Sequence, residues 1–163
     1  MYTIIGLGNP GEEYEKTRHN TGKMAMEALE RAEVNAKLIR QDTFMNKSGV
    51  AVAKVVKSKK AAGKLIVIYD DLDLPLGTMR ISYNRGSGGH KGLESVARAV
   101  KTKEFIRIRI GIGKKGDIEK HILGKFTPKE LEILKKTFKN VVTAVETIIE
   151  DGYERAMTEF NSK

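Results

Sequence analysis

His19 lies in the part of this 163-residue chain that best suits chemistry. Its segment, Thr17-Arg18-His19-Asn20-Thr21-Gly22, is polar and non-periodic, which is not the pattern of a core histidine. An imidazole has an ordinary pKa of about 6.5, so it can act as a general base at neutral pH. This segment alone also allows a surface or helix-entry histidine without a catalytic role.

Asp70 is the candidate partner of this histidine. The apolar run over residues 64–69 predicts a buried strand that ends at Asp70, and Asn9 follows the first predicted strand. Both side chains are therefore expected at the sheet edge where open α/β sheets bind their ligands. A carboxylate there can accept a proton from one imidazole nitrogen and fix the tautomer of the ring. We expect Asp70 to orient His19.

Water is the expected nucleophile. The chain has no cysteine and no Gly-x-Ser-x-Gly elbow, and Ser48 is expected to cap a helix. The three histidines lack the sequence spacing of a zinc site, so we expect no metal and no cofactor. For Asp71 and Asp73 the favoured interpretation is a solvated acidic turn.

The segment Gly6-Leu7-Gly8-Asn9-Pro10-Gly11 matches the dinucleotide-binding fingerprint G-x-G-x-x-G. That fingerprint needs a helix that begins within it and offers free N–H groups to a pyrophosphate. Pro10 removes one donor, and the next expected helix starts only near Lys23. A tight turn that presents Asn9 is the better interpretation, and a dinucleotide-dependent oxidoreductase is the weakest alternative.

Two loops offer further polar groups. Asn46 can donate its amide to a developing oxyanion, or it is an ordinary turn amide. The glycine-rich residues 86–92 precede a helix, and with Arg85 and Lys91 they can hold a phosphate.

The charge balance favours a polyanionic partner. Thirty basic residues against twenty-one acidic ones give a net charge of +9, which raises affinity for nucleic acid. Arg107 and Arg109 alternate with isoleucines on a predicted strand. With Arg80 and Arg85 they form either a basic track for a nucleic-acid backbone or a solvated face.

The elements that position these residues predict one α/β domain over residues 1–163. Strands and helices alternate, which implies a twisted, mixed and largely parallel sheet with helices on both faces. Strands are expected at residues 3–7, 37–39, 64–69, 78–83 (more exposed) and 106–112, and helices at 23–33, from 48, from 92, and in a long C-terminal segment from Thr127 to Gly152 with a short helix after it. No apolar run approaches a membrane span, and cytoplasm is the expected location.

Taken together, six segments resemble the bacterial peptidyl-tRNA hydrolases, in the family's order and over nearly the whole chain. They are Gly6-Leu7-Gly8-Asn9-Pro10-Gly11, Thr17-Arg18-His19-Asn20-Thr21-Gly22, Thr43-Phe44-Met45-Asn46-Lys47-Ser48-Gly49, Asp70-Asp71-Leu72-Asp73-Leu74-Pro75, Gly86-Ser87-Gly88-Gly89-His90-Lys91-Gly92 and Arg109-Ile110-Gly111-Ile112-Gly113. The resemblance implies a monomeric, metal-independent α/β enzyme. It would cleave the ester between a peptide and the 3′ end of tRNA and so rescue tRNA from peptides that the ribosome releases prematurely.

The resemblance also implies roles for individual residues. His19 resembles the family's catalytic base, and Asp70 resembles its carboxylate partner. Asn9 and Asn46 resemble the amides that bind the peptide and position the water or the carbonyl. Two further positions concern the tRNA: Tyr14 falls beside its 3′ end, and Arg109 resembles a residue that contacts its backbone near the 5′ phosphate.

The chain departs from the family's pattern at three places. Lys91 stands where the family usually has an asparagine that binds substrate, and it would meet a phosphate or the peptide instead. Residues 33–42 are shorter than in typical members, and Asp42 adds an acidic group near the expected cleft. Lys91 is the one feature that favours the leading alternative, a non-catalytic RNA-binding relative of the same fold.

Overall fold

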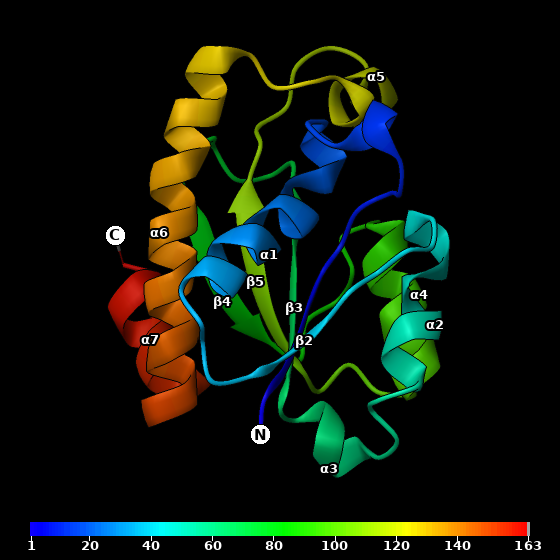
Figure 1. Ribbon diagram of the computed structural model, residues 1–163, viewed down its shortest axis with the longest axis vertical. Coiled ribbons are helices and arrows are strands. Elements are labelled where there is room, and N and C mark those ends of the chain that lie inside the picture. Colours follow the sequence, from blue (N-terminus) through cyan, green and yellow to red (C-terminus); the bar gives the residue numbers. More distant parts are fainter. Residues whose placement is uncertain (163) are drawn as a thin grey trace.

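Five strands form one sheet in the computed structural model, which describes residues 1–162 (Figure 1). They are β1 (Thr3–Gly6), β2 (Lys37–Ile39), β3 (Leu65–Asp71), β4 (Met79–Tyr83) and β5 (Ile106–Gly111). The order across the sheet is β2-β1-β3-β5-β4, with β4 antiparallel to β5 and the other pairs parallel. The predicted mixed and largely parallel sheet is confirmed.

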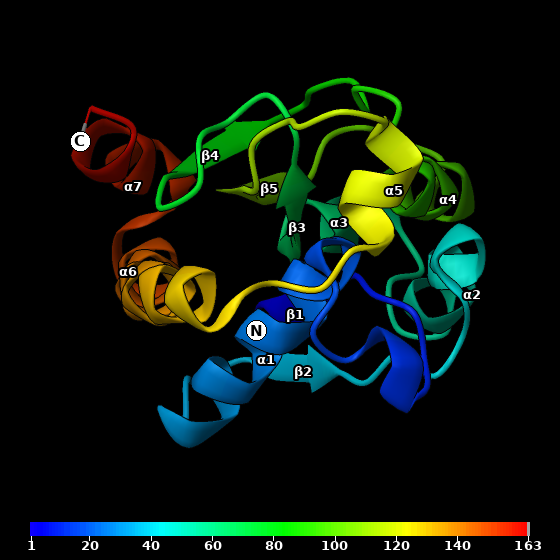
Figure 2. The same ribbon diagram turned by 90° about the horizontal axis from the view of Figure 1, so that it is seen from above.

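Helices cover both faces of the sheet. Figure 2 shows α6 (Pro128–Asp151) and α7 (Tyr153–Phe160) on one side and α2 (Ser48–Ala53) and α4 (Lys91–Val100) on the other. The remaining helices are α1 (Thr21–Arg31), α3 (Lys59–Ala62), α5 (Ile118–Leu123) and the 3-10 turns η1 (Glu12–Tyr14), η2 (Arg18–Asn20) and η3 (Met45–Lys47). Within residues 1–162, no helix combines the length and the apolar character that crossing a membrane requires.

Two hydrophobic cores result, one on each face. Ile66 and Ile68 of β3 pack in the core that α1, α6 and α7 share, whereas Val67 and Tyr69 pack in the core of α2 and α4. A strand between two helical layers must be apolar on both sides, which explains the unbroken apolar run of β3.

We expected the arginines of β5 to form an exposed basic face, and this expectation is wrong. Arg107 and Arg109 alternate with isoleucines, yet they are only 1% and 8% exposed. Their side chains lie on the sheet face that α2 and α4 cover, so alternation here separates two kinds of buried side chain. Similarly, the predicted exposure of β4 is wrong at Met79 and Ile81, which are buried because α7 packs against this strand.

Local signals fixed the ends of α6. Thr127 and Glu130 form the predicted capping box, and Gly152 ends the helix with a φ of +91°. The expected cap at Ser48 is wrong. Ser48 is the first residue of α2, and its buried hydroxyl donates to the Met45 carbonyl at 2.6 Å and accepts from the Gln41 amide at 2.7 Å.

A close backbone approach places η2 and α1 above the end of β3. Gly22 packs so tightly that a Cβ there would lie 2.1 Å from the Ile68 carbonyl oxygen. At the far edge of the sheet, Asn161 accepts from the Ile81 N–H and donates to the Ile81 carbonyl, both at 2.8 Å. The close approach of Gly22 to Ile68 brings His19 to the carboxyl end of β3.

Candidate active site

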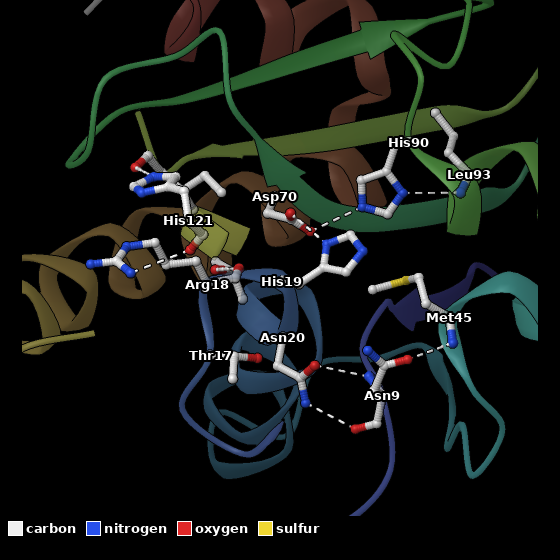
Figure 3. Close-up of polar contacts among 12 residues, drawn as sticks. Asn9, Thr17, Arg18, His19, Asn20, Met45, Asp70, His90, Leu93 and His121 are labelled. Atoms are coloured by element: carbon white, nitrogen blue, oxygen red, sulfur yellow. Dashed lines mark hydrogen bonds and ion pairs between the residues drawn. The ribbon is translucent and has the colours of Figure 1, made fainter. Parts of the chain in front are cut away.

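The predicted contact between His19 and Asp70 is present. The Nδ1 atom of His19 lies 2.8 Å from Oδ2 of Asp70, the penultimate residue of β3 (Figure 3). The His19 side chain is 13% exposed and the Asp70 side chain 3%. An ionised carboxylate can only accept, so Nδ1 carries the proton and Nε2 keeps its lone pair.

A second imidazole holds the other carboxylate oxygen of Asp70. His90 Nε2 lies 3.0 Å from Oδ1, and His90 Nδ1 accepts from the Leu93 N–H at 3.3 Å. His90 therefore has its proton on Nε2, and it caps α4 at the same time. Sequence reasoning missed this role, because histidine is not one of the usual residues at the start of a helix.

Asp70 is ionised at neutral pH. Burial alone would raise the pKa of this carboxyl group, but the electrostatic attraction of His90 and the hydrogen bonds from His19 and His90 outweigh it and lower the pKa to about 2. A permanent negative charge thus lies behind His19, where it stabilises an imidazolium ion.

Asn9 is held rigidly in the turn after β1. Its N–H donates to Asn20 Oδ1 at 2.8 Å, and its carbonyl accepts from Asn20 Nδ2 at 2.9 Å. Its side-chain Oδ1 accepts from the Met45 N–H at 2.7 Å. Its side-chain Nδ2 has no hydrogen-bond partner within residues 1–162. This free donor faces His19 (Figure 3). The role of Asn20 was not predicted.

The other predicted substrate contacts lie around this centre. Asn46 is exposed on η3, next to the Met45 that Asn9 holds. Tyr14 is half-buried on η1 and meets the exposed Phe44 edge to face, with 6.3 Å between ring centroids. Lys91 is exposed at the start of α4 and has no hydrogen bond or ion pair within the described chain.

The predicted basic track is only partly exposed. Arg80 and Arg85 are exposed, whereas Arg109 is buried and donates to Asp71 at 2.9 Å and to Ser82 at 3.1 Å. An ion pair offsets the cost of burying this guanidinium, and it draws Asp71 out of solvent. The interpretation of Asp71 as part of a solvated turn is therefore wrong.

Asp73, by contrast, is exposed and pairs with Lys114 at 2.6 Å. The hydrogen bond and charge of Lys114 lower the pKa of the Asp73 carboxyl group.

The histidines lack the sequence spacing of a zinc site, but the fold brings two of them together at Asp70. Ligand atoms of His19, Asp70 and His90 all lie within 4.8 Å of one another. However, the ring nitrogens that face Asp70 both donate protons to it, and a cation would have to displace both hydrogen bonds. The arrangement fits a carboxylate that orients two imidazoles.

The family model described as peptidyl-tRNA hydrolase matches residues 3–37 and 31–163. The peptidyl-tRNA hydrolase of a Thermoanaerobacter species (strain X514) is 42% identical over 99% of this chain and 100% of its own length. That of Aquifex aeolicus is 40% identical over 94% of this chain and 93% of its own. The crystal structure of the Acinetobacter baumannii peptidyl-tRNA hydrolase has a TM-score of 0.88, with 28% identity over 99% of this chain and 95% of that one.

These matches also bear on the segment after α1. The family model matches in two segments that overlap at residues 31–37, and the alignment with the Thermoanaerobacter protein spans 183 positions against the 163 residues of this chain. The relative therefore has residues that this chain lacks, in agreement with the expected trimming of residues 33–42.

Proposed function

Because this chain belongs to the peptidyl-tRNA hydrolase family, we propose that it hydrolyses the ester bond between a peptide and the 3′ end of tRNA. The contact that carries the proposal is the 2.8 Å hydrogen bond from His19 Nδ1 to Asp70, which leaves Nε2 free as a base. No observation favours the non-catalytic alternative, since Lys91 lies outside the hydrogen-bonded network of Asp70.

The first step activates water. A water molecule gives a proton to His19 Nε2 while its oxygen attacks the ester carbonyl carbon. The imidazolium that forms is stabilised by the ionised Asp70. The carbonyl oxygen becomes an oxyanion, and the free Nδ2 of Asn9 can donate to it.

The second step breaks the ester. The tetrahedral intermediate collapses, the bond from carbon to the ribose 3′ oxygen breaks, and the imidazolium returns its proton to that oxygen. The products are a peptide with a free carboxyl group and a tRNA with a free 3′ hydroxyl. An ester has a good enough leaving group that no covalent enzyme intermediate is required.

The remaining site residues are assigned to substrate binding. Asn46 and Lys91 lie on the two segments that flank the centre, and we assign them to the peptide or the 3′-terminal nucleotide. Tyr14 is assigned to the 3′ end, because a half-exposed aromatic ring can stack on a base. Arg80, Arg85 and Arg109 are assigned to the backbone of the acceptor stem, with Arg109 opposite Arg80 in the β4–β5 pair.

In the cell, this activity would return tRNA from peptidyl-tRNA that ribosomes release prematurely. We propose that the protein does so in the cytoplasm as a monomer, with residues 1–163 as a single domain and without a metal ion. The family assignment and the net charge of +9 support tRNA as the partner.

Substitution of His19 tests the proposal. His19→Ala should lower kcat on peptidyl-tRNA by about 10²–10⁴-fold with tRNA binding retained. His121→Ala is the matched control, since the His121 side chain contacts the Ile112 carbonyl and not Asp70. Near-wild-type cleavage by His19→Ala would overturn the assignment. Wild-type activity should persist in EDTA, and strong inhibition there would restore a metal site.

A further inference from the structure

We propose that a basic pocket between α4 and the segment leading into β5 binds a backbone phosphate of the tRNA. This inference rests on the proposed function. The pocket encloses about 590 Å³, and we call it the α4 pocket. Its cationic lining consists of Arg85, Arg98, Lys101, Lys103 and Arg107. Arg85 and Arg107 belong to the predicted basic track, whereas Arg98, Lys101 and Lys103 have no role assigned above.

Arg107 is a buried cation without a carboxylate partner. Its guanidinium donates to the carbonyl oxygens of Arg85 at 2.6 Å, of Lys103 at 2.7 Å and of Phe105, and it stacks over the Phe105 ring. Its Nε is buried and has no partner within the described chain. Burial lowers the pKa of Arg107 to about 10, and the charge of Arg85 contributes to the same effect.

A comparison with Arg109 shows how unusual this is. The two arginines lie on the same face of β5, two residues apart, and both are nearly fully buried. Arg109 is neutralised by Asp71 at 2.9 Å, whereas the hydrogen-bond acceptors of the Arg107 guanidinium are all neutral carbonyl groups. A buried charge is costly unless it is paired, so an anion bound in the α4 pocket would stabilise the Arg107 cation.

The rim of the α4 pocket is also unpaired. Arg85, Arg98, Lys101 and Lys103 are exposed, and none of them forms an ion pair within residues 1–162. The single acidic residue of the lining, Glu94, accepts a hydrogen bond from Ser87 at 3.0 Å.

Lys101 contributes a further cation to this rim, at a backbone position where lysine is uncommon. This residue ends α4 in the left-handed conformation, with a φ of +59°. Glycine is strongly preferred at such a position because it has no Cβ. The chain instead keeps a lysine there, which places one more cation at the rim of the α4 pocket.

Phosphate is the anion that this lining fits, because guanidinium groups bind its oxygens through paired N–H donors. The position of the pocket points to RNA. Ser87 is three residues from His90, which holds Asp70, and Lys101 lies at the opposite end of α4. An RNA whose 3′ ester reaches His19 could therefore run its backbone along α4 and meet several of these cations in turn.

The test neutralises two exposed rim residues, Arg98→Gln together with Lys101→Gln. The matched control is Lys129→Gln with Lys136→Gln, which removes the same charge from exposed positions of α6 on the opposite face. Each protein is assayed on peptidyl-tRNA and on a peptide esterified to a short single-stranded 3′ fragment of tRNA. Binding of deacylated tRNA is measured at several salt concentrations.

We expect the α4 pair to weaken tRNA binding roughly tenfold and to reduce the slope of log affinity against log salt by about one to two. The value of KM for peptidyl-tRNA should rise accordingly, with kcat and cleavage of the short fragment unchanged. An equal loss in the α6 pair, or loss of cleavage of the short fragment, would overturn the inference.

Two further outcomes distinguish failure of the proposed function from failure of the α4 pocket, and an RNA site from a small-anion site. Failure of the wild type to cleave either ester would refute the proposed function, while weakened binding of deacylated tRNA by the α4 pair would still support the pocket. Inorganic phosphate is the probe for a small-anion site. If it raises the Tm of the wild type but not of the α4 pair, and tRNA affinity is the same in both, the assignment to RNA is wrong.

Discussion

Replacing Asp70 by asparagine tests the hydrogen-bond pattern of the centre most directly. The change keeps the shape of a side chain that is 3% exposed but replaces one acceptor oxygen by an NH₂ donor. In the native protein the Asp70 carboxylate accepts from His19 on one oxygen and from His90 on the other. The amide of the variant can accept on one side only, so one of the two imidazoles must change its tautomer.

The contact with Leu93 decides which imidazole changes. His90 Nδ1 accepts from the Leu93 N–H, which keeps the proton of His90 on Nε2. The amide oxygen of the variant must then face His90, and its NH₂ group faces His19. His19 is forced to accept on Nδ1 and to carry its proton on Nε2, where the base is needed. The variant therefore holds its catalytic histidine in the wrong tautomer.

The expected loss of kcat depends on the free-energy cost of turning the side-chain amide of the variant the other way round. Turning the NH₂ group toward His90 would leave the Leu93 N–H without its partner, which costs about 1–3 kcal/mol and reduces the active population about 5- to 150-fold. Loss of the negative charge behind the imidazolium lowers the rate further. We expect kcat on peptidyl-tRNA to fall by about 10²–10⁴-fold in total.

A double variant gives the discriminating measurement in the same single-turnover assay. In Asp70→Asn with His90→Ala, the amide is free to turn its oxygen to His19, and activity should recover by about 5- to 150-fold relative to Asp70→Asn alone. His90→Ala alone reports the separate effect of losing the α4 cap. If the double variant is no more active than Asp70→Asn, the tautomer reasoning is refuted.

Three other predictions concern the oxyanion donor, the pH dependence of stability and the packing of Gly22. Asn9→Asp keeps the acceptor for the Met45 N–H but loses the free amide donor, so kcat should fall about 10²–10³-fold with little change in urea stability; retained activity would exclude Asn9 as an oxyanion donor. The folded pKa of Asp70, about 2, lies below its ordinary 3.8, so this group stabilises the fold above pH 4 by about 2 kcal/mol. That contribution should disappear as the pH falls toward 2, and urea unfolding of Asp70→Asn should lack it. Gly22→Ala would force a Cβ against the Ile68 carbonyl and should destabilise the protein by about 3 kcal/mol; an unchanged Tm would contradict the close approach.

Features with a local cause could be predicted from the sequence. The buried strand β3 and the ends of α6 depend on the residues within them, namely a continuous apolar run and a capping box. The burial of β5 could not be predicted in this way. Alternation along a strand separates two faces, but the helices that cover each face come from elsewhere in the chain.

The residues of the candidate site also divide into those that the sequence pattern marks and those that it does not. The contact of His19 with Asp70 could be predicted because ligands of open α/β sheets bind at the carboxyl ends of the strands, and Asp70 lies at that end of the buried strand β3. The roles of His90 and Asn20 depend on side chains 20 and 11 residues away, and no local pattern marks such a contact. The pairing of Arg109 with Asp71 was missed because it crosses from β5 to β3.

The contact of Asn161 with Ile81 has a consequence for self-association. An edge strand exposes a row of N–H and C=O groups to which a strand of another molecule can add. On β4 the side-chain amide of Asn161 occupies both backbone groups of Ile81, as a neighbouring strand would. At the opposite edge, β2 is three residues long and is followed by the exposed Arg40. Neither edge offers a long unpaired stretch, so the sheet is protected against edge-to-edge aggregation at both ends.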